Sequence, residues 1–452
     1  MKNIAHCHLI IAIFVLCLPA RYTCAQIRNV SSLVKAVNNG SPNDAMAVGP
    51  GTFELFEPLR PKAGMTIRGA GVGKTIITAA KSWDPGTDGL PDGDVKPKQV
   101  NRNAYLIDLG DKTHNVTISH MTLTGPRHHG AVHGNDCDGL ELSHLRVENF
   151  LWSSIRTFGM ANARVHDNVF VNAGGKFRHC GGALFLTWVV DSEFWNNRIT
   201  RNAGENFFGF KGRQAKGCRF HHNTVEVNFS LELPFENDAN NEIDHNAFWG
   251  VISIPKHAGG LVLKDGHSFR IHHNWLRPSY ALEWARNAAI VEYNLFDFDT
   301  AADGGNLISN FGKAPAPGPT HFRNNLIKNP GRGIFWSQGI YNRFYFENNH
   351  VITNTTTTPR KDGLFGLPST TDFKTIVIRN NIIECKGLPR PLVRNDASLK
   401  AVIENNTLVN VSDSASYPNP DTGAKRGPAK PLVFTCGVNG EFAVNNWDVT
   451  RP

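Results

Sequence analysis

Lysine, arginine, histidine and glutamate side chains recur at short intervals through the middle of the chain. The residues whose types suit catalysis are Lys211, Glu232, His179, His257 and Arg178. The residues that could bind a substrate around them are His133, Asn135, Arg156, Phe185, Arg213, Lys264, Glu283 and Lys256. Such a set can neutralise a carboxylate, remove a proton and donate another.

This combination suits the cleavage of a polymer that contains uronic acids. Elimination beside a sugar carboxylate needs a cation or hydrogen-bond donor on that carboxylate, a base for the adjacent proton and a donor for the leaving oxygen. We expect Lys211 to be the base, since nearby cations would lower its pKa; these are Arg213, Lys216 and Lys264. The groups expected on the carboxylate are Arg156, Arg178, His133 and Asn135, and the expected proton donors are His179 or His257. Phe185 or Trp152 would stack on a sugar ring.

A recurring asparagine indicates the elements that would hold these side chains. Segments such as "ARVHDNVFV", "RFHHNTVEV" and "RIHHNWLRP" align on it, at spacings of 20 to 32 residues over most of the chain. The aligned residues are Asn168, Asn197, Asn223, Asn246, Asn274, Asn294, Asn325, Asn349, Asn381, Asn406 and Asn446, and upstream His120 and His144 fit the same frame. Short alternating strands at this period are typical of a stacked parallel β-helix.

The asparagine column predicts a ladder, because each amide can bond the identical amide on the coils above and below. Histidines occupy the same turns, namely His221, His222, His245, His272 and His273. The ladder geometry explains them as scaffold or surface residues, and we expect no metal ligands among them.

A second row of strands supports this interpretation. Its first inward positions are apolar in every repeat: Val132, Ile155, Leu184, Phe208, Leu231, Leu261, Leu282, Leu307, Ile334, Leu364 and Leu392. The alternate residues of the same strands face outward and carry the charged groups. With coils ~4.8 Å apart, Lys211, Glu232 and Lys264 are expected to form a continuous line. The sequence thus predicts an all-β fold, a single-stranded right-handed parallel β-helix of about 12–13 coils with an N-terminal capping helix.

The ends of the stack have their own signals. Residues 31–39 form a short amphipathic pattern that would cover the first coil, and residues 45–55 and 65–80 follow as the first strands. An uncovered coil would be an open sheet edge, so a cap is expected there. Residues 82–103 and 412–431 are polar excursions, and the first is expected to be a solvated loop rather than a calcium site.

The first 25 residues resemble a secretory signal, which leaves residues 26–452 as one β-helix domain. We therefore expect a secreted protein, extracellular or periplasmic. Removing Lys2 and Arg21 changes the net charge from +8 to 8 − 2 = +6. A basic exported protein more often meets an acidic polysaccharide or a surface than a nucleic acid, although charge alone does not separate these partners. No later run is apolar enough to cross a membrane, so we expect an acidic polysaccharide as the partner and neither nucleic acid nor membrane. The five remaining cysteines, Cys137, Cys180, Cys218, Cys385 and Cys436, are expected to be mainly buried fillers.

Other interpretations of the candidate residues stay open. Glu232 and Glu283 would lie two coils apart, ~10 Å, near the upper limit for an inverting hydrolase. Lys211 and Glu232 could instead form only a cross-strand ion pair. The elimination requires no cofactor, although Glu232 with Glu236 and Asp238 could bind calcium.

At this point the repeats and the inward stripe resemble the right-handed parallel β-helix superfamily of pectate lyases and related polysaccharide lyases, epimerases and hydrolases. The resemblance covers nearly all of the mature chain and implies a monomer that acts on an acidic polysaccharide. It does not extend to a catalytic motif, so it supplies no active residue. A lyase is the preferred function, and a hydrolase, an epimerase and a non-catalytic carbohydrate-binding protein or adhesin are the alternatives.

Overall fold

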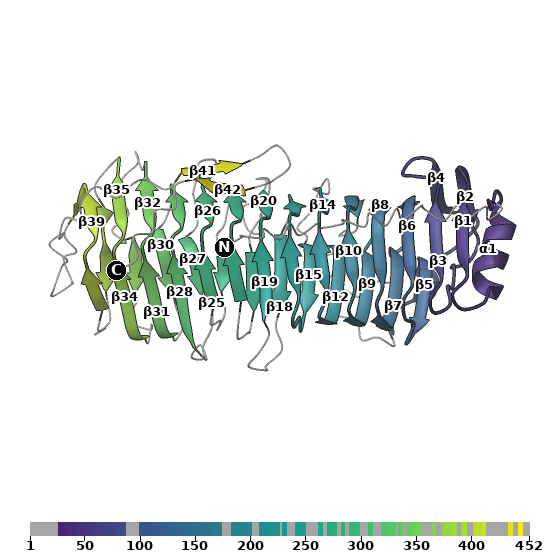
Figure 1. Cartoon of the computed structure of the whole chain (residues 1–452), viewed down its shortest axis with the longest axis horizontal. Coiled ribbons are helices and arrows are strands. Elements are labelled where there is room, and N and C mark those ends of the chain that lie inside the picture. Colours follow the sequence, from purple (N-terminus) through teal and green to yellow (C-terminus); the bar gives the residue numbers. More distant parts are fainter. Residues whose placement is uncertain are drawn as a thin grey trace, which may run out of the picture.

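The computed structural model of the chain is a long rod of stacked coils, with helix α1 (Val30–Asn39) across one end (Figure 1). It describes residues 26–86, 99–173, 182–200, 208–226, 228–232, 240–249, 261–264, 269–277, 282–284, 289–298, 306–310, 318–330, 333–337, 341–354, 364–367, 373–386, 390–395, 401–412, 433–436 and 442–445. In these ranges no helix is long and apolar enough to cross a membrane.

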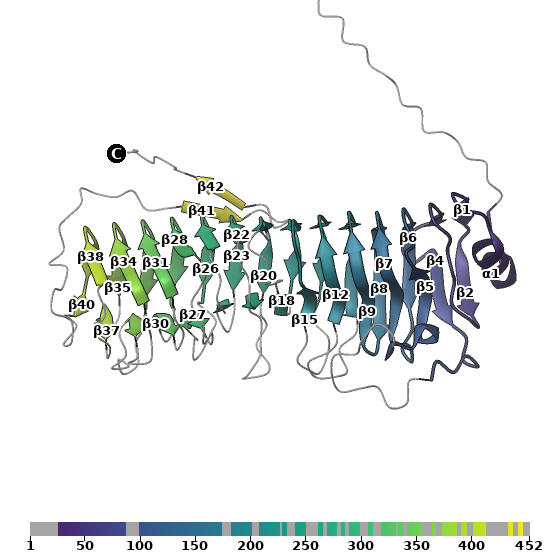
Figure 2. The ribbon, with the colours of Figure 1, turned by 90° about the horizontal axis from the view of Figure 1, so that it is seen from below.

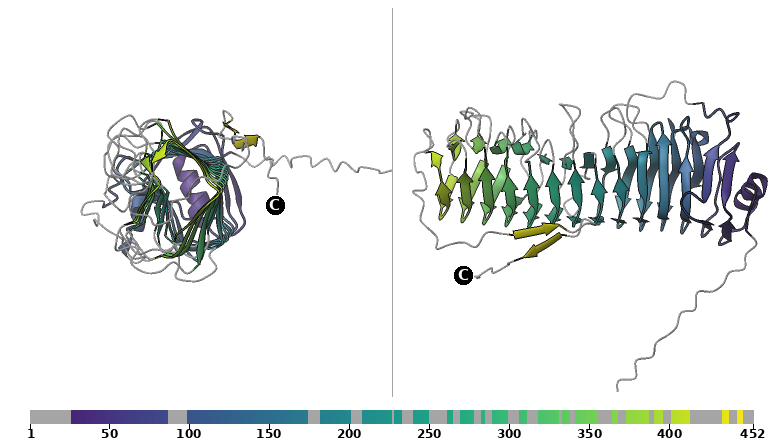
Figure 3. Two further views of the ribbon diagram at one scale, coloured as in Figure 1. Left: turned by 90° about the vertical axis from the view of Figure 1, so that its left-hand side faces the viewer. Right: turned by 90° about the horizontal axis from the view of Figure 1, so that it is seen from above.

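Helix α1 closes the N-terminal end of the rod, as Figure 3 shows along the axis. It begins after Asn29, whose side-chain oxygen accepts a hydrogen bond from the backbone N–H of Ser32 at 2.8 Å. Leu33 and Val37, four residues apart on one face, are fully buried in the main core. The predicted capping helix is therefore confirmed.

Three columns of parallel strands run along the rod (Figure 2), and a 26-stranded sheet contains the first two. The first column comprises β1 (Ala45–Val48), β3 (Thr66–Gly69), β6 (Thr117–Thr124), β8 (Glu141–Phe150), β10 (Arg164–His166), β13 (Glu193–Trp195), β16 (Arg219–His221), β19 (Asn241–Asp244), β22 (Phe269–His272), β25 (Ala289–Glu292), β28 (Pro319–Arg323), β31 (Tyr341–Glu347), β34 (Phe373–Arg379) and β38 (Ala401–Glu404). The second column, which β6 and β8 also enter, comprises β2 (Gly51–Leu55), β4 (Thr75–Ala79), β11 (Val169–Ala173), β14 (Arg198–Ile199), β17 (Thr224–Val225), β20 (Ala247–Trp249), β23 (Trp275–Arg277), β26 (Leu295–Asp297), β29 (Leu326–Lys328), β32 (His350–Thr353), β35 (Ile382–Cys385) and β39 (Thr407–Val409).

The third column is a separate 12-stranded parallel sheet. It comprises β5 (Tyr105–Asp111), β7 (Gly130–Asp138), β9 (Ser153–Ala161), β12 (Gly182–Val190), β15 (Phe208–Arg213), β18 (Asn228–Glu232), β21 (Leu261–Lys264), β24 (Leu282–Trp284), β27 (Asn306–Asn310), β30 (Gly333–Ser337), β33 (Phe365–Leu367) and β37 (Val393–Asn395). With one strand from each coil, this sheet spans 12 successive coils, in agreement with the predicted number.

A few short elements lie outside the columns. They are the 3-10 turn η2 (Arg102–Ala104), the parallel pair β36 (Arg390–Pro391) and β40 (Val411–Ser412), and the antiparallel hairpin β41 (Val433–Cys436) and β42 (Phe442–Asn445). The hairpin lies along the side of the rod (Figures 2 and 3).

The main core lies between the columns and is continuous along the stack. Parallel coils place like residues above one another, and the rings of Phe194 and Phe220 on successive coils are stacked with centroids 4.7 Å apart. The predicted inward stripe is buried at Val132, Ile155, Leu184, Leu307, Ile334, Leu364 and Leu392. Three cysteines are free and buried, as predicted: Cys137, Cys218 and Cys385.

The register of the third column differs from the prediction on three coils. Leu184 pairs with Phe210 rather than Phe208, and Phe229 rather than Leu231 occupies the next position. These two errors are two residues long, which keeps an apolar residue on the inward face because strand side chains alternate with a period of two. The third error is one residue long, since Leu282 pairs with Ile308 rather than Leu307. The alignment therefore looked consistent although it paired the wrong residues.

The predicted asparagine ladder is confirmed from Asn168 to Asn406. The nine side-chain amides from Asn168 to Asn381 each donate to the amide oxygen on the next coil at 2.9–3.2 Å. All ten amides are buried, so the hydrogen bonds satisfy groups that cannot reach water. Asn446 lies outside the described residues.

The two upstream histidines do not occupy the ladder position. His120 and His144 lie one residue earlier, in a corner column with left-handed backbone, where φ is 59° and 54°. The backbone N–H of Leu145 donates to the Asn168 side chain, so the ladder begins at Asn168. The same corner holds His222, His245 and His273, whose rings stack 5.0 Å apart.

The histidines beside the ladder take part in contacts between coils. The Nε2 atoms of His221 and His272 lie 2.8 and 2.7 Å from carboxylate oxygens of Glu193 and Glu242, respectively. His245 Nδ1 lies 2.8 Å from Asp244 Oδ2. These contacts fit the predicted scaffold role.

Candidate functional site

A row of polar and aromatic side chains crosses the third column on the face opposite the main core. Strand pairing places Asp108, His133, Arg156, Phe185 and Lys211 opposite one another on β5, β7, β9, β12 and β15. The neighbours Val132, Ile155 and Leu184 lie in the main core, so alternation directs His133, Arg156 and Phe185 to the other face. We call these five residues the outer row; although they lie on the outer face, all five are buried.

Asp108 and His133 form a buried pair within the outer row. His133 Nδ1 lies 3.3 Å from Asp108 Oδ1, and the His133 side chain is 0% exposed. Burial raises the pKa of Asp108, but the hydrogen bonds from His133 and Arg102 outweigh it and leave that pKa below its usual value. Burial lowers the pKa of His133, although Asp108 partly opposes this shift.

The charge of this pair determines which nitrogen of His133 carries the proton. The ionised Asp108 only accepts hydrogen bonds, so the neutral imidazole must hold its proton on Nδ1. Nε2 then keeps a lone pair, and it has no hydrogen-bond partner among the described residues. The geometry of a general base held by a carboxylate is therefore present.

Tyr105 lies beside this base. Its ring centroid is 5.2 Å from that of His133, and its hydroxyl has no hydrogen-bond partner in the described chain. Burial raises the pKa of Tyr105 well above its usual value, so the phenol keeps its proton and can donate it. A Cβ at Gly130 would lie 2.5 Å from Tyr105 Cε1, which shows that the ring packs directly against this glycine.

Further buried polar groups line the same region. Burial lowers the pKa of both His128 and His129 to about 4, so both rings are neutral near pH 7. The His129 ring lies 6.1 Å from that of Tyr105 and 5.6 Å from that of Trp152. Several side-chain atoms of His128, His129, Trp152, Ser153 and Ser154 have no hydrogen-bond partner among the described residues. Such a concentration is unusual in a core and suits the binding of a polar ligand.

Arg156 is the buried cation of the outer row. Its side chain lies over the rings of Phe158 and Phe185, at 3.7 and 3.9 Å from their centroids. Its Nη1 donates to the backbone oxygens of Thr157 and Phe185 and to Thr187 Oγ1. It is only 1% exposed, so its predicted contact with a substrate carboxylate stays a prediction, but its charge acts on the pKa values of Tyr105 and His133.

Lys211 does not have the neighbours that the sequence predicts. It pairs with Phe185 and Ser230, whereas Glu232 pairs with Arg213 and Lys264. The predicted step from Lys211 to Glu232 is therefore wrong, because of the two-residue register error, whereas the step from Glu232 to Lys264 is confirmed. Lys211 Nζ lies 5.1 Å from the Phe185 ring centroid, and the side chain is 5% exposed. Its role as a base stays a prediction.

Residues beside the outer row are exposed to solvent along one edge of the sheet. Trp188 ends this exposed edge at 48% exposure, and its ring lies 6.5 Å from that of Phe158. Its φ of 57° is rare for a bulky residue and is the kind of backbone strain found at functional sites. At the other end Asn135 donates to Asp111, which is paired with Arg102. Phe185 and Trp152 are buried and their predicted role as a sugar platform stays a prediction, whereas the exposed Trp188 is accessible to a sugar ring.

The remaining predicted site residues are only partly described. Arg178, His179, Lys256 and His257 lie outside the described residues. The backbone of Arg213, Glu232, Lys264 and Glu283 is described in β15, β18, β21 and β24, but their side chains are not. Glu283 pairs with Val262, so it lies in the outer row, whereas Glu232 lies in the next row along the strands. The loop 82–103 is described only in part, and residues 413–432 are not described.

Sequence reasoning missed Tyr105, Asp108 and Trp188. Tyr105 and Asp108 lie on β5, one coil before the first aligned repeat, and a strand signal in "YLIDLGD" was the available clue. Trp188 lies at a corner that the asparagine alignment does not include.

Two clusters on the first column, His144–His166–Asp167 and Glu242–Asp244–His272, have donor atoms close enough for a metal ion.

Comparison with known proteins identifies the fold. No family model matches the chain, and none of the curated proteins matches its sequence. The A-module of Azotobacter vinelandii mannuronan C-5 epimerase AlgE6 has a similar structure, with a TM-score of 0.52 and 11% identity over 83% of this chain and 93% of the module. The alginate lyase AlyF-OU02, in complex with G6, gives a TM-score of 0.49 and 12% identity over 92% and 88% of the two chains. The tailspike protein of E. coli bacteriophage HK620, in complex with a pentasaccharide, gives 0.48 and 10% over 84% and 71%.

These identities are too low to transfer an activity, but the likeness agrees with the three parallel columns and the stacked ladder. The chain therefore has the right-handed parallel β-helix fold.

Proposed function

We propose that this chain is a carbohydrate-active enzyme that cleaves an acidic, uronate-containing polysaccharide by β-elimination at the outer row. The observation that carries the proposal is the unpaired Nε2 atom of His133. Asp108 orients the His133 ring through Nδ1, and the ring lies beside Tyr105 and near the positive charge of Arg156. A protein with a similar fold is a mannuronan C-5 epimerase by name, and the net charge of +8 suits an acidic polymer.

In the proposed reaction, His133 Nε2 removes the proton from the carbon beside the sugar carboxylate. The electron pair of that C–H bond forms the new carbon–carbon double bond, and the bond to the leaving oxygen breaks. Tyr105 gives its phenolic proton to that oxygen, and water later carries the proton from His133 back to the phenolate. Asp108 stabilises the imidazolium, and the nearby charge of Arg156 favours the negative carboxylate and phenolate.

The outer row is covered, so substrate binding must displace some of the groups over it. Trp188 and Asn135 mark the exposed edge from which a polymer would enter. A covered site has a catalytic advantage, because charges interact more strongly where water is excluded. We infer that the enzyme is exported, since its substrate would be outside the cell.

An epimerase is the second candidate, because the same base begins both reactions. If Tyr105 returned a proton to the opposite face of the same carbon, the polymer would stay intact with inverted stereochemistry. An epimerase module shares the fold of this chain, so the fold is compatible with this alternative. For a hydrolase, Glu232 and Glu283 lie two coils apart and in different rows, which separates their backbones by more than about 10 Å.

The test uses the purified protein and a panel of alginate, pectate, glycosaminoglycans and bacterial acidic exopolysaccharides. Elimination produces an unsaturated uronate that absorbs in the ultraviolet. We expect absorbance to rise on one polymer. An inverted sugar composition without new chain ends would identify an epimerase instead, and new reducing ends without absorbance would identify a hydrolase. No change in any assay on any polymer would contradict the proposal and favour a binding protein.

Replacing Trp188 by alanine should weaken substrate binding more than it slows the chemistry. Loss of one exposed stacking platform corresponds to ~0.5–1.5 kcal/mol, which is roughly a two- to tenfold rise in KM with little change in kcat. Steady-state kinetics on the accepted polymer would measure both values. Trp188→Phe is the matched control and should keep most of the affinity; an unchanged KM in Trp188→Ala would exclude a contact with the sugar.

A further inference from the structure

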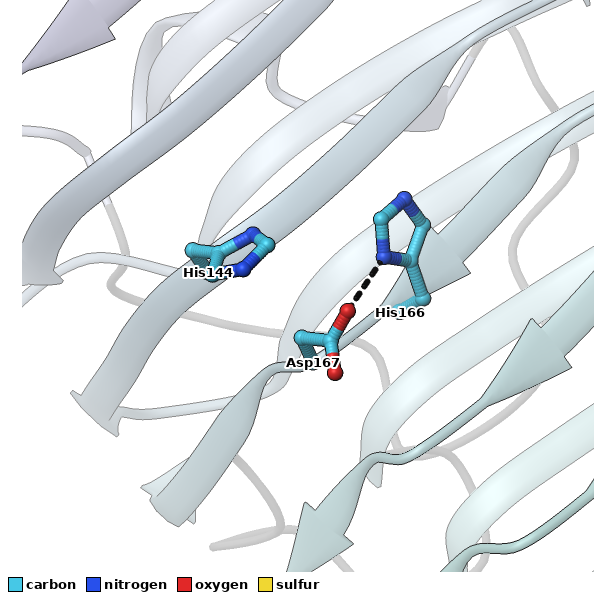
Figure 4. Close-up of side chains that lie close together, drawn as sticks. All are labelled: His144, His166 and Asp167. Atoms are coloured by element: carbon cyan, nitrogen blue, oxygen red, sulfur yellow. Dashed lines mark hydrogen bonds and ion pairs between the residues drawn. The ribbon is translucent and has the colours of Figure 1, made fainter. Parts of the chain in front are cut away.

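A cluster on the opposite side of the coil, in the first column, has a different chemistry from the outer row. His144 lies in β8, His166 ends β10, and Asp167 follows it on the same coil (Figure 4). One donor atom from each residue lies within 4.8 Å of the other two. Two imidazoles and a carboxylate form a typical donor set for a divalent transition metal ion.

The three side chains are accessible and partly oriented. His166 Nδ1 lies 2.7 Å from Asp167 Oδ2, and its ring stacks on Trp195 with centroids 4.0 Å apart. Glu141 Oε1 lies 3.7 Å from His166 Nε2, on the side away from Asp167. A carboxylate beside the second ring nitrogen is the usual support for a metal-binding histidine.

His144 is the adjustable member of the cluster. It is exposed and stacks on His120 with centroids 4.5 Å apart. Two nitrogen ligands of one tetrahedral ion are about 3.4 Å apart, since each metal–nitrogen bond is about 2.1 Å long. Closing the cluster onto an ion therefore needs donor atoms to move by up to about 1.4 Å, which an exposed imidazole can do by rotating its side chain.

The second cluster, Glu242, Asp244 and His272, has a similar spacing between its donor atoms, but its carboxylates lie beside arginines. Asp244 is fully buried and accepts hydrogen bonds from Arg219 Nε and Nη2 at 3.0 and 2.9 Å. Glu242 lies 3.7 Å from Arg219 and 3.6 Å from Arg270. An ion there would have to displace arginines that already neutralise the carboxylates. In contrast, no arginine or lysine of the described chain lies within 4.0 Å of the Asp167 carboxylate.

From these contacts we infer that His144, His166 and Asp167 form a binding site for a divalent transition ion such as Zn²⁺, Co²⁺ or Ni²⁺. Imidazole nitrogen favours these ions over calcium. The ion would join two successive coils through β8 and β10. Solvent exposure leaves room for water in its remaining coordination positions. The inference does not depend on the proposed reaction, because the site lies on a different sheet.

The variants for the test are chosen so that the backbone is preserved. His144 and Asp167 have left-handed backbone, with φ of 54° and 55°, and asparagine occupies the same corner at Asn196 and Asn324. The variants His144→Asn and Asp167→Asn should therefore fold normally. His245→Asn is the matched control, because His245 occupies the same corner with φ of 52° and contacts Asp244 of the second cluster.

The measurement is titration calorimetry of the full chain, without an affinity tag and freed of metal, with Zn²⁺ and Co²⁺. The visible absorption of Co²⁺ reports whether nitrogen ligands are bound. We expect about one equivalent to bind and the melting temperature to rise with the ion. His144→Asn and Asp167→Asn should weaken binding tenfold or more, and His245→Asn should not.

Three outcomes would overturn the inference. They are the absence of stoichiometric binding, equal binding by all three variants, and loss of binding in His245→Asn alone. The last outcome would place the ion at His245 and its neighbour Asp244 instead.

Discussion

Replacing His133 by alanine should reduce the rate of elimination by roughly 10²–10⁴-fold, the usual contribution of a general base. The variant lacks the lone pair that removes the substrate proton, while Tyr105 and the exposed edge are retained. The rise of ultraviolet absorbance on the accepted polymer would measure kcat, and KM should change much less. Asp108→Asn should act in the same direction, because its amide would donate to Nδ1 and force the proton onto Nε2.

The pH profile distinguishes a base from a structural residue. Burial lowers the pKa of His133, so the imidazole is neutral and active near pH 7. Activity should therefore be lost only as the pH falls below about 6.5, the ordinary value for histidine. Lys211→Ala is the critical comparison. If it abolished elimination while His133→Ala kept normal kcat and the same acid limb, Lys211 would be the base and our assignment would be wrong. Melting curves of all variants would reveal loss of folding.

The sequence allowed the scaffold to be predicted because one physical requirement repeats on every coil. An asparagine at a corner must satisfy its amide, and it does so with the same residue on the next coil, so Asn168 to Asn406 are visible as a period. Alternation then placed Val132, Ile155 and Leu184 inside and His133, Arg156 and Phe185 outside. The sequence pattern therefore identified three members of the outer row, namely His133, Arg156 and Phe185.

Other features of the site depend on distances between side chains, which the spacing of the repeats along the sequence does not determine. Arg156 looks like a surface cation in the sequence, but two aromatic rings and three oxygen acceptors bury it. The pairing of Lys211 required the exact length of a loop, and a two-residue error preserved the apolar pattern. Tyr105 and Asp108 belong to a coil without the marker asparagine. Only the three-dimensional register brings them to His133.

The asparagine ladder, which allowed the fold to be predicted from the sequence, should also contribute strongly to the free energy of unfolding. Asn246 lies in the middle of the ladder and is 1% exposed. Its oxygen accepts from both the backbone and the side-chain nitrogen of Asn223, and its amide donates to the Phe220 oxygen and to Asn274. Its replacement by alanine would leave buried donors and acceptors unsatisfied on both neighbouring coils.

Asn246→Ala should therefore lower the free energy of unfolding by about 3 kcal/mol or more, since each unsatisfied buried group costs ~1–3 kcal/mol. Denaturant unfolding, followed by circular dichroism, would measure the loss as a lower midpoint. Asn196→Gly is the control, because this asparagine is exposed at a left-handed corner where glycine fits, and its loss should cost ~1 kcal/mol or less. Equal midpoints for the two variants would mean that the amides merely fill space between the coils. A much lower midpoint for Asn246→Ala would show that hydrogen bonds between the coils hold the stack, and with it the outer row, in register.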